Sequence, residues 1–233
     1  MIMLGPEYHL IEEAIPDDHA RTSSAEDLLS GVLDARAPGA LDILDLGCGD
    51  GRGLDLVRGF RPEARYTGVD IETSPEVNAR SRSDGTFVTY DGVNLPFGDG
   101  SFDIVYSRQV FEHVRHPDLV TQEVRRVLRP GGIFAASLSN LEPYHSFSIF
   151  NYTPYGVFRL IDDNGLTLRT MRPGIEGTSL VVRQLTMRKI SGFGVIYPGI
   201  AFAGRLRGWS PRRRNYLKLR FSGHICFVAT RDV

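Results

Sequence analysis

Short, mainly apolar runs alternate with amphipathic segments over the first 139 residues. Runs that stop at a glycine or an acid are typical of buried parallel strands, and we expect strands at 41–48, 66–70, 86–90, 102–107 and 132–138. Apolar positions spaced three and four residues apart predict helices at 22–36, 54–60, 74–81, 108–114 and 117–128. Strands and helices thus alternate with short connections.

The pattern is less regular beyond Ser139. It predicts a helix over 153–164, a strand over 166–171, a helix over 178–189 and a strand over 216–231 that is interrupted near Ser222 and Gly223. Together the two parts predict an α/β fold. We expect a doubly wound, Rossmann-like sheet of about seven strands, mostly parallel, with an antiparallel C-terminal strand.

Composition excludes several classes of protein. The chain has 233 residues, 42% of them hydrophobic, which suits one α/β domain. It contains no run of ~18 apolar residues and begins without a basic, then apolar, leader, so neither a membrane span nor a secretory signal is expected. Cys48 and Cys226 form no ligand pattern, which predicts no metal site and reduced thiols in a cytoplasmic protein.

Charge is distributed unevenly along the chain. Residues 1–150 hold 24 Asp and Glu against 13 Lys and Arg, whereas residues 151–233 hold 4 against 14. The basic excess is densest in Arg205–Arg220. It predicts either an anionic partner, such as a phosphate group or a membrane surface, or neutralisation by the acidic N-terminal part within the fold. A pI near 6.6 argues against a general nucleic-acid binder.

A glycine-rich loop follows the first expected strand. Asp45-Leu-Gly47-Cys-Gly49-Asp-Gly51-Arg-Gly53 would bring backbone amides close to a ligand. Asp70 ends the next strand, where an acid can grip the two hydroxyls of a ribose. The pattern is thus typical of an adenosine-containing cofactor. Arg52 stands where the dinucleotide fingerprint requires a third glycine, which disfavours a nicotinamide cofactor.

Four segments in series resemble the class I S-adenosylmethionine-dependent methyltransferases, in the small-molecule branch of the methyltransferase type 11 kind. They are ILDLGCGDGRG at 43–53, YTGVDI at 66–71, TYDGVNLPFGDGSFDIVYSRQVFEHV at 89–114 and RRVLRPGGIF at 125–134. The resemblance implies one methyltransferase domain over 1–233. It would consist of an N-terminal helical cap (1–40), a cofactor-binding core (41–139) and an acceptor-side region (140–233).

The same resemblance implies roles for individual residues. Those that would bind S-adenosyl-L-methionine are Asp45, Gly47, Gly49, Asp70, Ile71, Asp91, Gly92, Val93, Ser107 and Arg108. Within this set, Asp70 would hold the ribose, Ile71 would pack on adenine, and Asp91 would accept from the adenine amine. Structural roles remain open for some of these, and Asp45 could simply cap a turn.

Aromatic and histidine residues mark the expected acceptor side. His113 and His145 are candidate bases, and Tyr144, Tyr152 and Tyr155 are candidate pocket residues, with structural roles or core packing as the alternative for each. SRQVF at 107–111 replaces the tetrapeptide that amine methylators carry, which favours oxygen as the methylated atom. We therefore expect methyl transfer to a small molecule, namely a natural product or a sugar that could be nucleotide- or lipid-linked. The alternatives are a nucleotide-binding oxidoreductase or a non-catalytic binding protein of the same fold.

Overall fold

The computed structural model describes residues 4–18, 22–142, 146–187, 189 and 194–233. Seven strands form one sheet in the order β3-β2-β1-β4-β5-β7-β6 within these residues. The strands are β1 (Asp42–Leu46), β2 (Arg65–Ile71), β3 (Thr86–Tyr90), β4 (Phe102–Arg108), β5 (Leu128–Ser139), β6 (Thr167–Pro173) and β7 (His224–Thr230). β1 to β5 pair in parallel and β7 runs antiparallel to both of its neighbours, as the sequence predicts.

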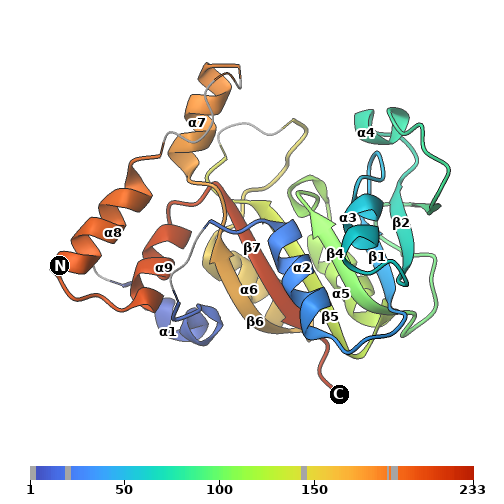
Figure 1. Ribbon diagram of the computed structural model, residues 1–233, viewed down its shortest axis with the longest axis horizontal. Helices are drawn as coiled ribbons and strands as arrows, with labels where there is room; N and C mark the ends of the chain where they lie inside the picture. Colours follow the sequence, from blue (N-terminus) through green and yellow to red (C-terminus); the bar gives the residue numbers. More distant parts are fainter. Residues whose placement is uncertain (1–3, 19–21, 143–145, 188, 190–193) are drawn as a thin grey trace.

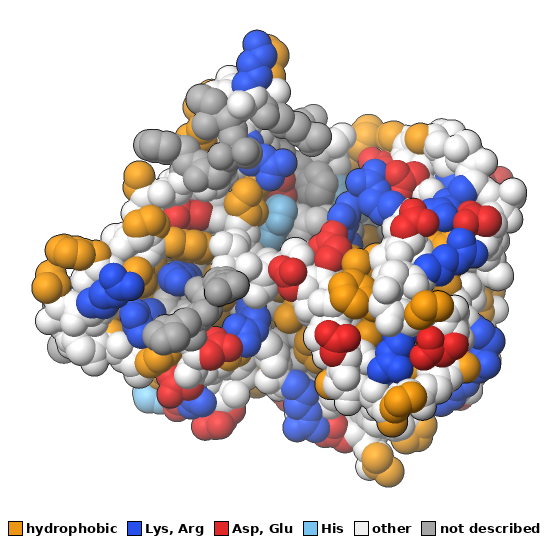
Figure 2. Space-filling model, in the orientation of Figure 1, with side chains coloured by type: hydrophobic (Ala, Val, Ile, Leu, Met, Phe, Trp, Pro, Cys, Tyr) orange, Lys and Arg blue, Asp and Glu red, His pale blue; other side chains and the backbone are white. Residues whose placement is uncertain are grey.

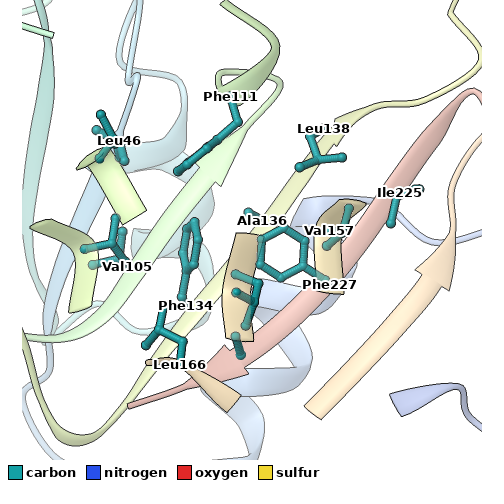
Figure 3. Packing of buried hydrophobic residues seen from close by; sticks show 14 of the residues in the cluster. Leu46, Val105, Phe111, Phe134, Ala136, Leu138, Val157, Leu166, Ile225 and Phe227 are labelled. Carbon is teal, nitrogen blue, oxygen red and sulfur yellow. The ribbon is translucent and has the colours of Figure 1, made fainter. Parts of the chain in front are cut away.

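Helices lie on both faces of this sheet (Figure 1). They are α1 (Tyr8–Ile11), α2 (Ala25–Ala35), α3 (Gly53–Phe60), α4 (Pro75–Asn78), α5 (Pro117–Val127), α6 (Pro154–Asp162), α7 (Gly177–Leu185), α8 (Ile196–Leu206) and α9 (Pro211–Leu219), with 3₁₀ turns η1 (Glu12–Ala14) and η2 (Phe111–His113). Apolar side chains of α2 and α3 pack on one face of the sheet. Those of α5 and α6 pack on the other, against Phe134 and Phe227 (Figure 3).

Three expected elements differ clearly from the structure, and the first is the helix expected over 74–81, which is shortened to α4. The strand expected over 216–231 is wrong in its first part, because Ser210 caps α9 and Pro211 opens it, so Tyr216 lies in a helix. The helix expected over 108–114 is reduced to η2, since the backbone of Gln109 takes a positive φ of 55° that no α-helix contains. No helix within the described ranges is both long and apolar enough to cross a membrane.

The N-terminal residues contact the basic C-terminal part. Asp18 forms an ion pair with Arg172 at 2.6 Å, and Asp17 Oδ1 accepts from the backbone N–H of Arg212 at 2.8 Å. The Tyr216 hydroxyl donates to Glu7 at 2.7 Å. Part of the charge asymmetry is therefore neutralised within the fold.

Candidate functional site

The glycine loop between β1 and α3 lies at the edge of the sheet where the parallel strands end. Gly47 and Gly49 have positive φ values of 75° and 51°, which favour glycine. A Cβ at Gly47 would lie 2.2 Å from Val110 Cγ2, so a side chain there would block the approach of the segment after β4. The loop lies at the amino end of α3, where anionic groups are favoured.

Asp70 occupies the end of β2 directly beside this loop. Its Oδ2 accepts from the Gly49 N–H at 2.7 Å and its Oδ1 from the Ile71 N–H at 2.8 Å. Burial raises the pKa of Asp70, and these two hydrogen bonds oppose that rise. Each carboxylate oxygen keeps a further lone pair, so Asp70 can accept from two additional hydroxyl donors.

Asp45 is buried beneath the loop rather than exposed on it. The Tyr66 hydroxyl donates to Asp45 Oδ2 at 2.6 Å, and burial raises the pKa of Asp45 to about 7. Gly53 makes room for this carboxylate, because a Cβ at Gly53 would lie 2.1 Å from Asp45 Oδ2. Asp45 therefore supports the loop from the side of the sheet. The sequence alone does not predict that Tyr66 is its hydrogen-bond partner.

The loops after β2 and β3 form the next part of the site. Ile71 is 41% exposed, and a Cβ built on Gly92, which has a φ of 90°, would lie 3.8 Å from Ile71 Cγ2. Asp91 Oδ1 accepts from the backbone N–H groups of Val93 and Asn94. The pKa of Asp91 is lowered, chiefly by a hydrogen bond from the Asn94 side chain and then by these two backbone bonds. The result is an apolar surface with a fixed carboxylate beside it.

Ser107 and Arg108 end β4, next to the glycine loop. The Ser107 hydroxyl is buried and makes no hydrogen bond within the described part of the chain. Arg108 points outward and forms an ion pair with Glu26 in the first turn of α2. Burial raises the pKa of Glu26, but the hydrogen bond and charge of Arg108, together with a backbone hydrogen bond and one from Ser24, outweigh it, so the pKa is lowered.

These features fit the cofactor that the sequence resemblance implies. Asp70 has lone pairs for a ribose diol, and Ile71 and Gly92 offer a surface for a flat ring. The Ser107 hydroxyl is a buried polar group still without a partner, of the kind that a bound ligand can satisfy. The residues expected around the cofactor thus lie together at one edge.

The candidate acceptor residues are spread more widely. His113 lies in η2 and is half-buried, whereas Tyr152 is buried and donates its hydroxyl to the Phe111 carbonyl at 3.0 Å, which favours packing. Tyr155 is 40% exposed and stacks on Phe158. Tyr144 and His145 lie outside the described residues.

A polar cluster that the sequence analysis missed lies at the same edge, at the ends of β5 and β7. We call it the edge cluster, and its members are Gln109, Glu112, Ser139, Glu142 and His224. Ser139 Oγ lies 3.0 Å from Glu112 Oε1 and 2.8 Å from Glu142 Oε2. His224 Nε2 lies 3.1 Å from Glu142 Oε2.

This cluster could have been predicted from the residue at which the last strand begins. An antiparallel strand begins where its parallel neighbours end, so a strand starting at His224 places that side chain at the ligand edge. The strand expected over 216–231 is interrupted near Ser222 and Gly223, just before His224, but the sequence analysis assigned no site to this position. No group of three or more His, Cys, Asp or Glu in the described ranges could hold a metal ion.

Comparisons with known proteins agree with this geometry. A family model described as a methyltransferase domain matches residues 44–136. The phthiotriol/phenolphthiotriol dimycocerosates methyltransferase of Mycobacterium tuberculosis is 33% identical over 72% of this chain and 60% of its own length. The fatty-acid O-methyltransferase of Mycolicibacterium smegmatis is 41% identical over 40% of this chain and 35% of its own length. The chain thus spans less than two thirds of these relatives.

A solved structure shows the same fold. An S-adenosylmethionine-dependent methyltransferase from Mesorhizobium loti superposes with a TM-score of 0.56 at 18% identity, covering 90% of this chain and 99% of the other. Neither an oxidoreductase nor a non-catalytic binding protein is favoured by these matches. By its sheet order, its glycine loop and the methyltransferase domain matched over residues 44–136, the chain is similar to the class I S-adenosylmethionine-dependent methyltransferases.

Proposed function

We propose that the chain transfers the methyl group of S-adenosylmethionine to an oxygen atom of an apolar small molecule. The observation that carries this proposal is the closeness of two sites: Val110, next to the edge cluster residues Gln109 and Glu112, contacts Gly47 of the cofactor loop. A relative named as a fatty-acid O-methyltransferase supports an acceptor oxygen on an apolar chain. A natural product or a lipid-linked sugar belongs to the same class of acceptor.

In this proposal the chain acts mainly by positioning its two ligands. The cofactor supplies a methyl group that is already activated by the sulfonium. Asp70 and the glycine loop would fix the adenosine end of the cofactor. The segment from Ser107 to His113 would lie between that adenosine end and the acceptor. Holding the two reactants in contact can lower the barrier by ~7–11 kcal/mol. An acceptor that must lose a proton also needs a base, for which the sequence names His113 as a candidate.

Calorimetric titration tests the cofactor part of this proposal first. S-adenosylhomocysteine should bind, and NAD, used as the control, should not. Methyl transfer from labelled S-adenosylmethionine to dodecanoic acid then tests the acceptor class. NAD binding without S-adenosylhomocysteine binding would contradict the cofactor, whereas cofactor binding without transfer to any apolar acid or alcohol would contradict the acceptor.

We also propose that α8 and the basic residues around it contact an anionic membrane surface. Val195, Phe202 and Leu206 are 58%, 66% and 73% exposed and lie on one face of the helix, opposite the buried Ile200. Figure 2 shows hydrophobic and basic side chains side by side where Figure 1 places α8 and α9. An exposed apolar stripe beside cations suits the boundary between lipid headgroups and acyl chains.

Charge supports this surface as well. No ion pair involves Arg205, Arg207 or Arg214 within the described ranges, and Arg207 lies over the Trp209 ring at 5.6 Å. Vesicles with one third phosphatidylserine should sediment the chain, and Phe202→Asp should abolish this. The control Phe60→Asp changes an exposed phenylalanine of α3, at 44% exposure, and should leave sedimentation unchanged. Equal sedimentation of both variants would contradict the proposed surface.

A further inference from the structure

The edge cluster joins four separate parts of the chain. Glu112 comes from η2, Ser139 from the end of β5, Glu142 from the segment after it, and His224 from the first position of β7. Ser139 and His224 are paired directly across the two strands, so their side chains lie on the same face of the sheet. Residues from 109 to 224 thus converge on a single point.

Burial distinguishes the cluster from an ordinary surface ion pair. Glu112 and Ser139 are fully buried, and the side chains of Glu142 and His224 are 11% and 25% exposed. The Gln109 amide, oriented so that its oxygen accepts from the Leu138 N–H, places its nitrogen 3.1 Å from Glu112 Oε1, 3.2 Å from Ser139 Oγ and 3.2 Å from His224 Nε2. Two carboxylates are therefore held close together behind a histidine that solvent can reach.

Hydrogen-bond capacity determines which nitrogen of His224 carries a proton. A serine hydroxyl has one proton and can donate to only one of Glu112 and Glu142 at a time. The two amide protons of Gln109 can go to Glu112 Oε1 and Ser139 Oγ. Glu142 Oε2 lies 3.1 Å from His224 Nε2, and the neutral ring therefore carries its proton on Nε2 and donates it to Glu142. Nδ1 then keeps its lone pair, and it makes no hydrogen bond to any described residue.

The cluster is also adjacent to the proposed methyl-transfer site. β7 is separated from β4 by one strand, so His224 lies about 10 Å across the sheet from the end of β4. Gln109 and Glu112 of the cluster flank Val110, which contacts Gly47. An acceptor bound over the end of β5 would meet the cofactor on the β4 side and the His224 ring on the β7 side.

We propose that His224 is the general base of the reaction and that Glu142 is its positioning residue; this inference rests on the proposed function. As the new bond forms between the acceptor oxygen and the methyl carbon, the carbon–sulfur bond breaks and its electron pair stays on sulfur. The hydroxyl proton of the acceptor passes to His224 Nδ1. Glu142, hydrogen-bonded to Nε2, offsets the positive charge that the ring gains.

The ring tautomer gives a test that needs no acceptor. In the ¹⁵N-histidine-labelled chain with S-adenosylhomocysteine, the NMR signals lost in His224→Gln identify this ring. Its neutral form should carry the proton on Nε2 in the unchanged chain, and this preference should be lost in Glu142→Ala. A proton on Nδ1 in the unchanged chain would overturn the proposal.

Kinetics with two acceptors separates a base from a structural residue. 4-Octylphenol keeps its proton near neutral pH, whereas dodecanoic acid is already ionised. His224→Gln should lower kcat on the phenol by ~10²–10⁴-fold, with little change in KM, in kcat on the acid or in S-adenosylhomocysteine affinity. Imidazole should restore part of the lost turnover to His224→Ala. Equal losses on both acceptors would overturn the proposal.

The chain offers a matched control for these variants. His9 and Glu12 form a histidine–carboxylate pair at 3.3 Å, but the His9 side chain is 77% exposed on α1. His9→Gln should leave turnover on both acceptors unchanged. Failure to bind S-adenosylhomocysteine would refute the proposed function itself, and cofactor binding without methylation of either probe would refute its acceptor class. If the cofactor binds but neither probe is methylated, the tautomer of His224 still tests whether Glu142 positions this ring.

Discussion

The two ends of the ligand edge hold their polar side chains in different ways. Towards β2, the partners are close in sequence: Gly49 with Asp70 and Asp45 with Tyr66 are each 21 residues apart. Towards β7, the hydrogen bond between His224 and Glu142 joins residues 82 positions apart. The glycine loop and Asp70 at the first end can therefore be recognised from a local pattern, whereas the pair at the second end exists only after the last strand has entered the sheet.

The largest expected effect is a pH dependence of stability caused by Asp45, at the β2 end of the edge. Because burial raises the pKa of Asp45 to about 7, the folded chain binds more protons than the unfolded chain between about pH 4 and pH 7. Relative to Asp45→Asn, the free energy of unfolding should therefore fall as pH rises through this window, by up to about 1.4 kcal/mol per pH unit. Urea denaturation of both chains across the window measures it, and parallel pH profiles would contradict this burial.

A smaller effect is expected from two glycines of α3. Gly53→Ala would place its Cβ 2.1 Å from Asp45 Oδ2, and we expect a loss of about 1–3 kcal/mol of unfolding free energy from overpacking. Gly59→Ala meets no atom within 4 Å and should instead stabilise the chain by about 0.5–1 kcal/mol. Thermal unfolding of the pair gives the comparison, and similar shifts for both would count against the packing of Asp45.

The smallest effect separates the two ends of the edge by binding. Asp70→Ala should weaken S-adenosylhomocysteine binding at least about tenfold, roughly 1.4 kcal/mol for a lost charged hydrogen bond. Glu142→Ala, at the other end, should leave this affinity unchanged. Asp99→Ala is the control, since this exposed carboxylate pairs with Arg126 at the opposite edge. If calorimetry finds that Asp70→Ala binds S-adenosylhomocysteine as tightly as the unchanged chain does, Asp70 does not bind the ribose.

Prediction was most successful where the chain folds on nearby partners. Asp70 and the glycine loop could be placed together because a strand, a turn and a helix follow one another over about 30 residues, as in any βαβ unit. The strand expected over 216–231 failed for the opposite reason. The apolar residues after Ser210 and Pro211 also fit a strand, but the cap at Ser210 starts a helix, and Tyr216 of that helix packs against Tyr8 with ring centroids 4.8 Å apart.

The sequence by itself determined the parallel core, the adenosine-type loop and the acid at the end of β2, because hydrophobic periodicity and glycine conformation act over short distances. Only the tertiary structure decided that Tyr66 binds Asp45, that the acidic N-terminus neutralises part of the basic C-terminus, and that His224 meets Glu142. These contacts depend on strand order and register, which bring distant residues together and which no local pattern encodes.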